Sequence, residues 1–366
     1  MSVHFSNTVF IGSKEGGFDF LQESPILVSI LGLKAWVYKK GNRGDGFVVE
    51  IKKLTILVIT ITERLQDNSK CYERLGQKCN MDLLKLTRDQ AKKFYNHLNL
   101  EGLERYDRVL MDLPFRAIFS SQKQLRKIKR LTMWEDDTCQ NYIKQSRWYG
   151  KFVKFYRSLP GVRVLTTSGF VTEQFIQEGI DAVYIGKSFD EVVIFNKGKN
   201  RDIVYAFVGR TNSKVYSLRK KTLDEIASLL PIKMVRSEPG STYNDLLNRI
   251  VYFISADVGL DEYMAKNFEA LGAGCVLCTY SIPFENVLVG FKDMENVVLY
   301  SSPAELFKKI SILEADPALK IKIIKNGLLL AEQHSFQHHA DELFNAIAVK
   351  FSRDVRKLNF FEKIFN

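Results

Sequence analysis

Residues 251–280, VYFISADVGLDEYMAKNFEALGAGCVLCTY, hold a strand, a helix and a second strand in succession. The apolar runs VYFISA and CVLCTY predict the strands, and AKNFEALGAG carries apolar residues at helical spacing. Strands joined by a helix favour parallel pairing, because a parallel crossover needs a connection of roughly a dozen residues or more. The stretch therefore predicts part of a parallel sheet with helices packed on it.

The same alternation continues on both sides of this stretch. Further strands are predicted at 105–114, 130–137, 162–168, 182–188, 201–211 and 231–238, and further helices at 172–180, 213–230, 243–250 and 302–314. Strands that alternate with helices of this length are typical of the α/β class.

The length of 366 residues predicts two domains that face a cleft. Polar and turn-forming residues in 187–202 separate two strand–helix runs, so we expect one domain at 1–190 and a second at 191–347. The segment 5–67 is rich in β-formers around the turn GNRGDG, which is consistent with an antiparallel element near the N-terminus. The tail, 348–366, has apolar residues at helical spacing and predicts an amphipathic C-terminal helix.

The composition excludes several classes of protein. Apolar residues make up 46% and charged residues 26%, which is typical of an ordinary folded chain. No apolar run is long enough for a membrane helix, and the start lacks the features of a signal peptide, so we expect a cytoplasmic protein. Five scattered cysteines indicate free thiols. Cys275 and Cys278 have C-x-x-C spacing but lie in a predicted strand, where positions three apart face opposite sides.

Three histidines near the C-terminal end lack the spacing of a metal site. His334, His338 and His339 lie in EQHSFQHHADELF, without the His-Glu-x-x-His arrangement of a zinc helix. We expect a solvated helix face there, and no metal site.

A loop in the second half suits a diphosphate. In open parallel sheets, ligands bind beyond the carboxyl ends of the strands, where helix N-termini attract anions. The sequence GRTNSK follows the strand at 201–211; Gly209 permits close approach of the backbone, and Arg210 and Lys214 supply positive charge. Arg210 is the residue we expect to stabilise a leaving diphosphate.

Three acids gather around the start of the helix in 261–280. Asp261 and Glu262 precede it, and Glu269 lies about two turns further on, so that a loop acid and a helix acid can face one ligand. Carboxylates accept hydrogen bonds from hydroxyls, and the pair therefore suits a sugar or ribose. The alternative is that the first two acids only complement the positive helix end and Glu269 is solvated.

These motifs together resemble the C-terminal half of group 1 glycosyltransferases of the GT-B fold. The resemblance rests on YAFVGRTNSK, the acid-x7-Glu spacing in DEYMAKNFEALGAGCVLCTY and the closing AEQHSFQHHADELFNAI, over about residues 200–347. It implies two Rossmann-like domains and a nucleotide-sugar donor in the cleft. The resemblance also implies that the reaction retains the anomeric configuration of the sugar. The sequence has no evident metal-binding Asp-x-Asp motif, so metal-independent transfer is the simpler expectation.

The resemblance also implies roles for residues. Arg210 and Lys214 would bind the diphosphate, Glu269 the ribose, and Asp261 or Glu262 the donor sugar. Gly16 and Gly17, in IGSKEGGFDF, resemble the family's glycine loop after the first strand, although the β-rich segment that follows departs from the family's long helix.

Glu135 and Asp136, in MWEDD, follow an apolar run at the expected end of a strand. They are candidates for contacts with the donor sugar or for the general base that takes the acceptor proton. An acidic cluster at a helix N-terminus is the alternative.

The net charge of +11 is concentrated partly in 123–130 and 144–157, the latter interleaved with aromatic residues. In a glycosyltransferase this suits a lipid-linked or cell-surface glycan acceptor, as in lipopolysaccharide or capsule synthesis, at the inner membrane surface. The alternatives are a nucleic-acid-binding protein that uses the same segments, a catalytically inactive GT-B protein that binds glycan, and a helix with one packed and one solvated side.

Overall fold

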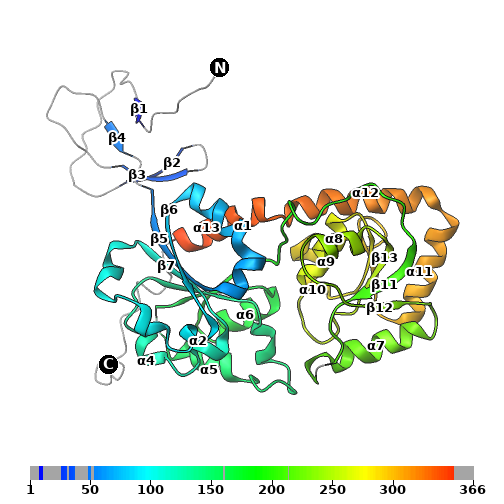
Figure 1. Cartoon of the computed structure of the whole chain (residues 1–366), viewed down its shortest axis with the longest axis horizontal. Coiled ribbons are helices and arrows are strands. Elements are labelled where there is room, and N and C mark those ends of the chain that lie inside the picture. The colour runs from blue at the N-terminus through cyan, green and yellow to red at the C-terminus, as the bar shows by residue number, and fades with distance from the viewer. Residues whose placement is uncertain are drawn as a thin grey trace.

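Two parallel sheets, one in each half of the chain, form the frame of the molecule (Figure 1). The structure is a computed structural model. It describes residues 53–349, except 160 and 213, together with four short strands nearer the N-terminus. Gly16, Gly17 and most of the predicted C-terminal helix lie outside the described residues. The α/β class predicted from the sequence is confirmed.

The first sheet has six parallel strands in the order β10-β9-β8-β7-β5-β6. Its strands are β5 (Thr55–Ile61), β6 (Asn80–Leu86), β7 (Arg108–Asp112), β8 (Leu131–Glu135), β9 (Arg163–Thr166) and β10 (Asp181–Tyr184). The helices between them are α1 (Thr62–Lys78), α2 (Arg88–Ala91), α3 (Phe115–Ile118), α4 (Gln122–Leu125), α5 (Lys151–Arg157) and α6 (Gly169–Gln177).

The β-rich N-terminal segment divides between two kinds of pairing. The strands β1 (Thr8–Phe10) and β4 (Val48–Glu50) pair antiparallel, as do β2 (Ile26–Ile30) and β3 (Leu33–Val37), which confirms the antiparallel element. β5, however, pairs in parallel with β6 and β7 inside the first sheet, so that part of the expectation was wrong. Its sequence, TILVITI, is an unbroken apolar and β-branched run because both faces of the strand are covered.

The second sheet has five parallel strands in the order β12-β11-β13-β14-β15. Its strands are β11 (Ile203–Val208), β12 (Lys233–Val235), β13 (Ile250–Ser255), β14 (Val276–Tyr280) and β15 (Val298–Tyr300). Its helices are α7 (Ser217–Ala227), α8 (Ser241–Leu247), α9 (Ala265–Gly272), α10 (Pro283–Val289), α11 (Pro303–Ala315) and α12 (Pro317–Gln333).

The stretch 251–280 forms the predicted unit: β13, α9 and β14, with β13 and β14 paired in parallel. Gly274 has φ +77° between α9 and β14, a conformation that side chains rarely adopt and that explains glycine at this turn. Cys275 and Cys278 are both buried, in separate apolar clusters. All five cysteines are buried and unpaired by disulfides, as expected.

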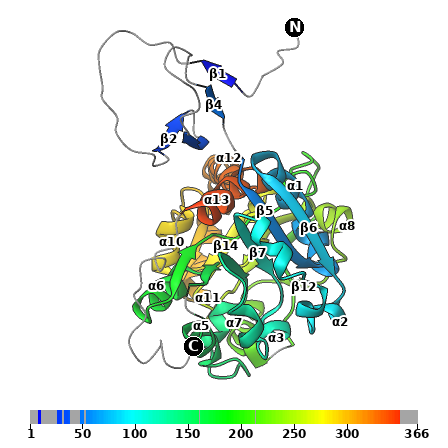
Figure 2. The same cartoon turned by 90° about the vertical axis from the view of Figure 1, so that its left-hand side faces the viewer.

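The last described helix, α13 (Phe336–Ala348), returns to the first domain and packs against α1 and the first sheet (Figure 2). Phe336, Leu343 and Ile347 join one buried cluster with residues of β5 and α1. The predicted boundary at 347 placed this helix with the second domain; the structure instead packs its apolar face on the first.

Candidate active site

A cavity of about 360 Å³ lies between the two domains. Its walls come from four parts of the chain: the first sheet and α1, the linker after β10, the second domain, and α13. The residues that line it include Trp134, Asp136, Thr167, Lys187, Phe189, Tyr243, Glu269 and His339. The cleft expected from two facing domains is therefore present.

Asp136 follows β8 and reaches this cavity from the first domain. Its carboxylate Oδ2 lies 2.9 Å from Nη1 of Arg64 on α1, and its side chain is 36% exposed. Arg64 also pairs with Asp112, a fully buried carboxylate that accepts hydrogen bonds from Thr60 (3.1 Å) and Tyr72 (2.5 Å). Asp112 ends β7 beside β5, where the strand order reverses, so the polar cluster occupies the switch point of the first sheet.

Glu135, one residue earlier, lies on the other side of the strand. Its side chain is buried and accepts a hydrogen bond from the hydroxyl of Tyr156 in α5. Burial raises the pKa of Glu135 to about 8, although Tyr156 and Arg64 oppose the shift. The expectation that Glu135 faces the cleft is corrected, because adjacent residues of a strand point to opposite faces and only Asp136 lines the cavity.

Glu269 reaches the cavity from the second domain. It lies in the second turn of α9, and its Oε2 accepts a hydrogen bond of 2.9 Å from the hydroxyl of Tyr243 on α8. Glu269 and Asp136 thus bring two carboxylates, one from each domain, to the same cavity.

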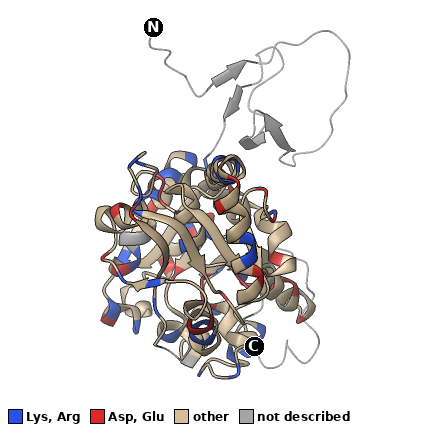
Figure 3. Cartoon of the chain, turned by 90° about the vertical axis from the view of Figure 1, so that its right-hand side faces the viewer, with Lys and Arg blue, Asp and Glu red and all other residues tan. Residues whose placement is uncertain are grey.

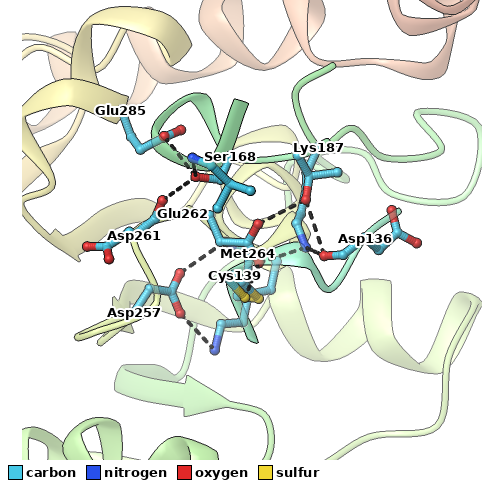
Figure 4. Close-up of polar contacts among 12 residues, drawn as sticks. Asp136, Cys139, Ser168, Lys187, Asp257, Asp261, Glu262, Met264 and Glu285 are labelled. Carbon is cyan, nitrogen blue, oxygen red and sulfur yellow. Dashed lines mark hydrogen bonds and ion pairs between the residues drawn. The ribbon is translucent and has the colours of Figure 1, made fainter. Parts of the chain in front are cut away.

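Glu262 does not face the cavity; it is buried where the domains meet (Figure 4). Its carboxylate accepts hydrogen bonds from Thr167 (2.9 Å) and Cys139 (3.2 Å) of the first domain and lies 3.5 Å from Nζ of Lys187 in the linker. Burial raises the pKa of Glu262, and Lys187 opposes that shift. The expected contact of Glu262 with a donor sugar is corrected, because its oxygens are already engaged by the opposite domain.

Asp261 has an exposed side chain and a backbone φ of +52°. Its carbonyl oxygen accepts a hydrogen bond of 2.7 Å from the hydroxyl of Ser168, at the start of α6. Glu285 of α10 also reaches this point and accepts hydrogen bonds from Ser168 (3.3 Å) and the amide of Phe170 (3.1 Å). The loop before α9 is therefore anchored to the first domain beside the cleft.

Gly209 and Arg210 follow β11 at the switch point of the second sheet, between β11 and β13. Gly209 has φ +150°, and a Cβ there would lie 3.5 Å from Nζ of Lys266. The side chain of Arg210 is exposed, and Lys214 begins a short 3₁₀ helix, Lys214–Tyr216. The predicted anion loop thus lies at the place where open α/β sheets bind ligands.

Two further cations, Lys266 and Arg219, lie at this switch point. The sequence motifs gave the main roles to Arg210 and Lys214 instead. Both face Asp257, a fully buried carboxylate after β13: Arg219 at 2.7 Å and Lys266 at 3.9 Å. Asp257 also accepts a hydrogen bond of 3.1 Å from the amide of Met264, the residue before α9. The second domain therefore concentrates positive charge and a helix N-terminus next to Gly209.

Burial lowers the pKa of Lys266 to about 7, and the attraction of Asp257 only partly offsets it. Asp257 itself has a lowered pKa: burial acts to raise it, but Lys266 and Arg219 outweigh that effect. An anion bound beside Gly209 would favour the charged form of Lys266.

Comparisons with known proteins show where this fold occurs elsewhere. Residues 221–345 match the family model described as glycosyl transferase-like. The fold is similar to sucrose-phosphate synthase from Thermosynechococcus elongatus, with TM-score 0.55 and 10% identity over 80% of this chain and 98% of that one. The chain has the GT-B fold, and its second domain is similar to the glycosyl transferase-like family.

Other solved structures share the fold of this chain. Phage T4 β-glucosyltransferase in complex with UDP-glucose has TM-score 0.52 and 10% identity, over 81% of this chain and all of that one. The pneumococcal O-GlcNAc transferase GtfA, in complex with UDP and GlcNAc, has TM-score 0.50 and 14% identity, over 70% of this chain and 58% of that one. No curated protein matches the sequence.

The aromatic residues of 144–157 are mostly core residues. Phe152, Phe155 and Tyr156 are buried, and Phe152 stacks on Phe115 at 3.8 Å between ring centroids. Basic residues between them are exposed at Lys154 and on both flanks. The segment has one packed and one solvated side, the structural alternative named above.

The expectation that His334, His338 and His339 lie on a solvated helix face is correct only for His338. His338 is exposed, but His339 is buried in the cavity wall and His334 stacks on Phe268 at 4.1 Å between ring centroids. Within the described part of the chain, no group of three or more potential ligands could hold a metal ion. In the same part, no helix has the length and apolar character needed to cross a bilayer.

Proposed function

We propose that this protein transfers a sugar from a nucleotide-sugar donor to an acceptor hydroxyl in the interdomain cleft. The observation that carries the proposal is that Asp136 and Glu269, carboxylates from opposite domains, line one cavity. The GT-B fold and the glycosyl transferase-like match of the second domain support the same reaction class.

The donor would bind to the second domain. Amides near Gly209, with Lys266 and Arg210, would take the diphosphate, since a switch point with helix N-termini and cations attracts phosphate. Glu269 would accept hydrogen bonds from the ribose hydroxyls, with Tyr243 holding its carboxylate in place. Lys214 stays a candidate for the diphosphate and Asp261 for the donor sugar.

The chemical step would depend on charge placement. Negative charge grows on the diphosphate as the sugar leaves, and Arg210 and Lys266 would stabilise it, so we propose transfer without a metal ion. Asp136 would accept the proton or the hydrogen bond of the acceptor hydroxyl, held in position by Arg64. Retention of configuration is proposed on the acid-x7-acid resemblance. Turnover that survives excess EDTA would support transfer without a metal ion. The anomeric configuration of the product, measured by proton NMR, tests retention.

The acceptor we propose is an anionic cell-surface glycan or a lipid-linked saccharide. Exposed basic residues in 123–130 and 144–157 support an anionic partner. On the side of the molecule shown in Figure 3, in contrast, basic and acidic residues are interspersed. Binding of vesicles that contain anionic lipid, lost at high salt, would support association with the inner membrane surface. Nucleic acid is less favoured, because buried Phe152 and Phe155 cannot stack on bases.

A thermal-shift screen with nucleoside diphosphates and nucleotide sugars tests the proposal. A matching donor should raise the melting temperature of the wild type, and Glu269→Gln should reduce the shift. Glu225→Gln, at an exposed position of α7, should leave it intact. Absence of any shift across the screen would refute a nucleotide-sugar enzyme. Binding without hydrolysis or transfer over an acceptor panel would instead indicate an inactive GT-B protein.

A further inference from the structure

Two buried nitrogen atoms in the cleft wall have no hydrogen-bond partner among the described residues. They are Nε1 of Trp134 and Nε2 of His339, and their residues are 4% and 3% exposed. Both residues line the interdomain cavity. Buried polar groups in folded proteins are nearly always hydrogen-bonded, and an unsatisfied one costs free energy, so two on one wall need a reason.

The fold brings these two residues together from distant parts of the sequence. Trp134 is the fourth residue of β8 and His339 lies in the first turn of α13, the helix that returns to the first domain. Their ring centroids are 5.4 Å apart with 38° between the planes. Tyr72 also packs edge-on against the indole, at 6.1 Å between ring centroids, so two rings hold the indole in the wall.

The chemistry of the two nitrogens defines what can bind. An indole N–H only donates a hydrogen bond, whereas a neutral imidazole nitrogen donates or accepts according to its tautomer. Burial lowers the pKa of His339 to about 4, although Asp136 opposes the shift, so the imidazole is neutral at pH 7. Nδ1 of His339 lies 3.9 Å from the carboxylate of Glu342, beyond a normal hydrogen bond. A hydroxyl group, which donates and accepts, suits this pair.

We propose that Trp134 and His339 bind a sugar hydroxyl of the ligand in the interdomain cleft. This inference rests on the proposed function and assigns to α13 a direct part in substrate recognition. The nucleotide would bind to the second domain, so Trp134 and His339 on the opposite wall would contact the sugar that it carries. If the nucleotide lies closer to the first domain, they would contact its ribose instead.

The test compares Trp134→Phe and His339→Phe with wild type by isothermal titration. The probes are UDP, GDP and ADP, each alone and as its glucose conjugate. The controls are Trp148→Phe, which packs on Phe115 away from the cavity, and His338→Phe, which is exposed on the same helix. His339→Gln keeps a hydrogen-bonding group on the side chain and should restore part of the binding.

Each cleft variant should weaken binding of the matching glucose conjugate about three- to tenfold, as loss of one hydrogen bond predicts, and the controls should not. Weakening of the conjugate alone assigns the contact to the transferred sugar; equal weakening of the bare diphosphate assigns it to the ribose. The melting temperatures of the ligand-free variants should stay level or rise, because an apolar ring removes an unsatisfied nitrogen.

Unchanged affinity for every probe that binds wild type would overturn the inference and leave the proposed function standing. A clear loss of melting temperature in both ligand-free variants, with ligand affinity retained, would assign the residues a structural role and also overturn it. Failure of wild type to bind any probe would instead remove the proposed function, and the inference with it.

Discussion

At the scale of single residues, Lys266 has the most unusual electrostatic setting near the proposed diphosphate site. Its ammonium group lies 3.9 Å from Asp257 and 4.2 Å from the centroid of the Phe207 ring, and a Cβ at Gly209 would lie 3.5 Å from it. Burial lowers its pKa to about 7. A small change in its surroundings therefore changes its charge at neutral pH.

Donor binding should depend on pH through Lys266. A bound diphosphate favours the charged ammonium, so affinity should be full below the pKa of about 7 and fall by up to about tenfold per pH unit above it. Above pH 7 the phosphate groups stay almost fully ionised, since their last pKa is about 6, so the fall in that range comes from Lys266. Titration of a matching nucleoside diphosphate from pH 6 to 9 measures this.

Two variants isolate the cause of that pH dependence. Lys266→Arg keeps its charge at all these pH values and should give a flat profile, and Lys266→Ala should be weak and flat. A wild-type affinity constant from pH 6 to 9, or a Lys266→Arg profile as steep as that of wild type, would contradict the prediction.

The acidic residues show how far a cavity-lining position can be predicted from the sequence. Glu269 and Asp136 line the cavity, as the motifs suggested, whereas Glu262 and Glu135 are buried beside them. Which of two adjacent acids faces the cleft depends on strand direction and on the opposite domain. A motif fixes spacing along the chain and carries no information on that packing.

At the scale of elements, the start of α9 depends on Asp257. The carboxylate accepts hydrogen bonds from the Met264 amide (3.1 Å) and the Asn267 side chain (2.8 Å) and pairs with Arg219 at 2.7 Å. A negative charge at a helix N-terminus is favourable, and the carboxylate of Asp257 also compensates the positive charge of the buried Arg219.

Asp257→Asn should therefore destabilise the protein strongly. The amide can still accept a hydrogen bond at the start of α9, but Arg219 would lose its buried counter-charge, at a cost of about 3–5 kcal/mol. Urea unfolding measures the change. Asp202→Asn breaks a solvent-exposed pair with Arg249 and should have little effect, since water and salt screen such a pair; a similar loss of stability in both variants would show that burial of the pair is not what matters.

The elements most easily predicted were those with strong local patterns. β13, α9 and β14 lie where their apolar periodicity placed them. β5 was misplaced because a buried central strand and an antiparallel strand rich in β-branched residues look alike in sequence. The docking of α13 on the first sheet was missed, since periodicity shows that a helix has an apolar face and does not show which domain covers it.

At the scale of the whole molecule, the contact between the two domains includes a buried carboxylate. Glu285 of α10 reaches across to the start of α6 and accepts a hydrogen bond from the amide of Phe170. Burial raises its pKa to about 7, although the amides of Phe170 and Gly169 oppose the shift.

The stability of the domain contact should therefore vary with pH. The folded pKa of Glu285 is above its usual value, so its contribution is fully present below about pH 4.5 and is lost as the pH rises through about 7. Relative to wild type, Glu285→Gln should become more stable from pH 5 to 8, by roughly 2 kcal/mol. Melting temperatures of both proteins across that range measure the difference. A difference that does not change with pH would contradict the assignment.

The linker between the domains is held by two backbone hydrogen bonds of Phe189 and by the contact of its ring with α9. The amide of Phe189 donates a hydrogen bond to the His334 carbonyl (3.1 Å), and the Phe336 amide donates one to the Phe189 carbonyl (2.9 Å). The Phe189 ring covers Gly272, where an added Cβ would lie 2.6 Å from the ring. This contact requires glycine because a buried ring between two hydrogen-bonded segments has little room to move.

Gly272→Ala should therefore destabilise the protein by about 1–3 kcal/mol, despite the better helix propensity of alanine, because the ring and with it the linker must shift. Phe189→Leu in the same chain should recover part of that loss, so that the two substitutions are less harmful together than their sum, a coupling that a double-mutant cycle measures. Gly76→Ala, in α1, is the matched control: its Cβ would lie 3.5 Å from Met81, an ordinary contact, and it should be neutral or slightly stabilising. Because Phe189 also lines the cavity, the same shift should lower transfer more than donor affinity. Additive effects of the two substitutions would show instead that Gly272 and Phe189 act independently, and that the linker is not held in place by this contact.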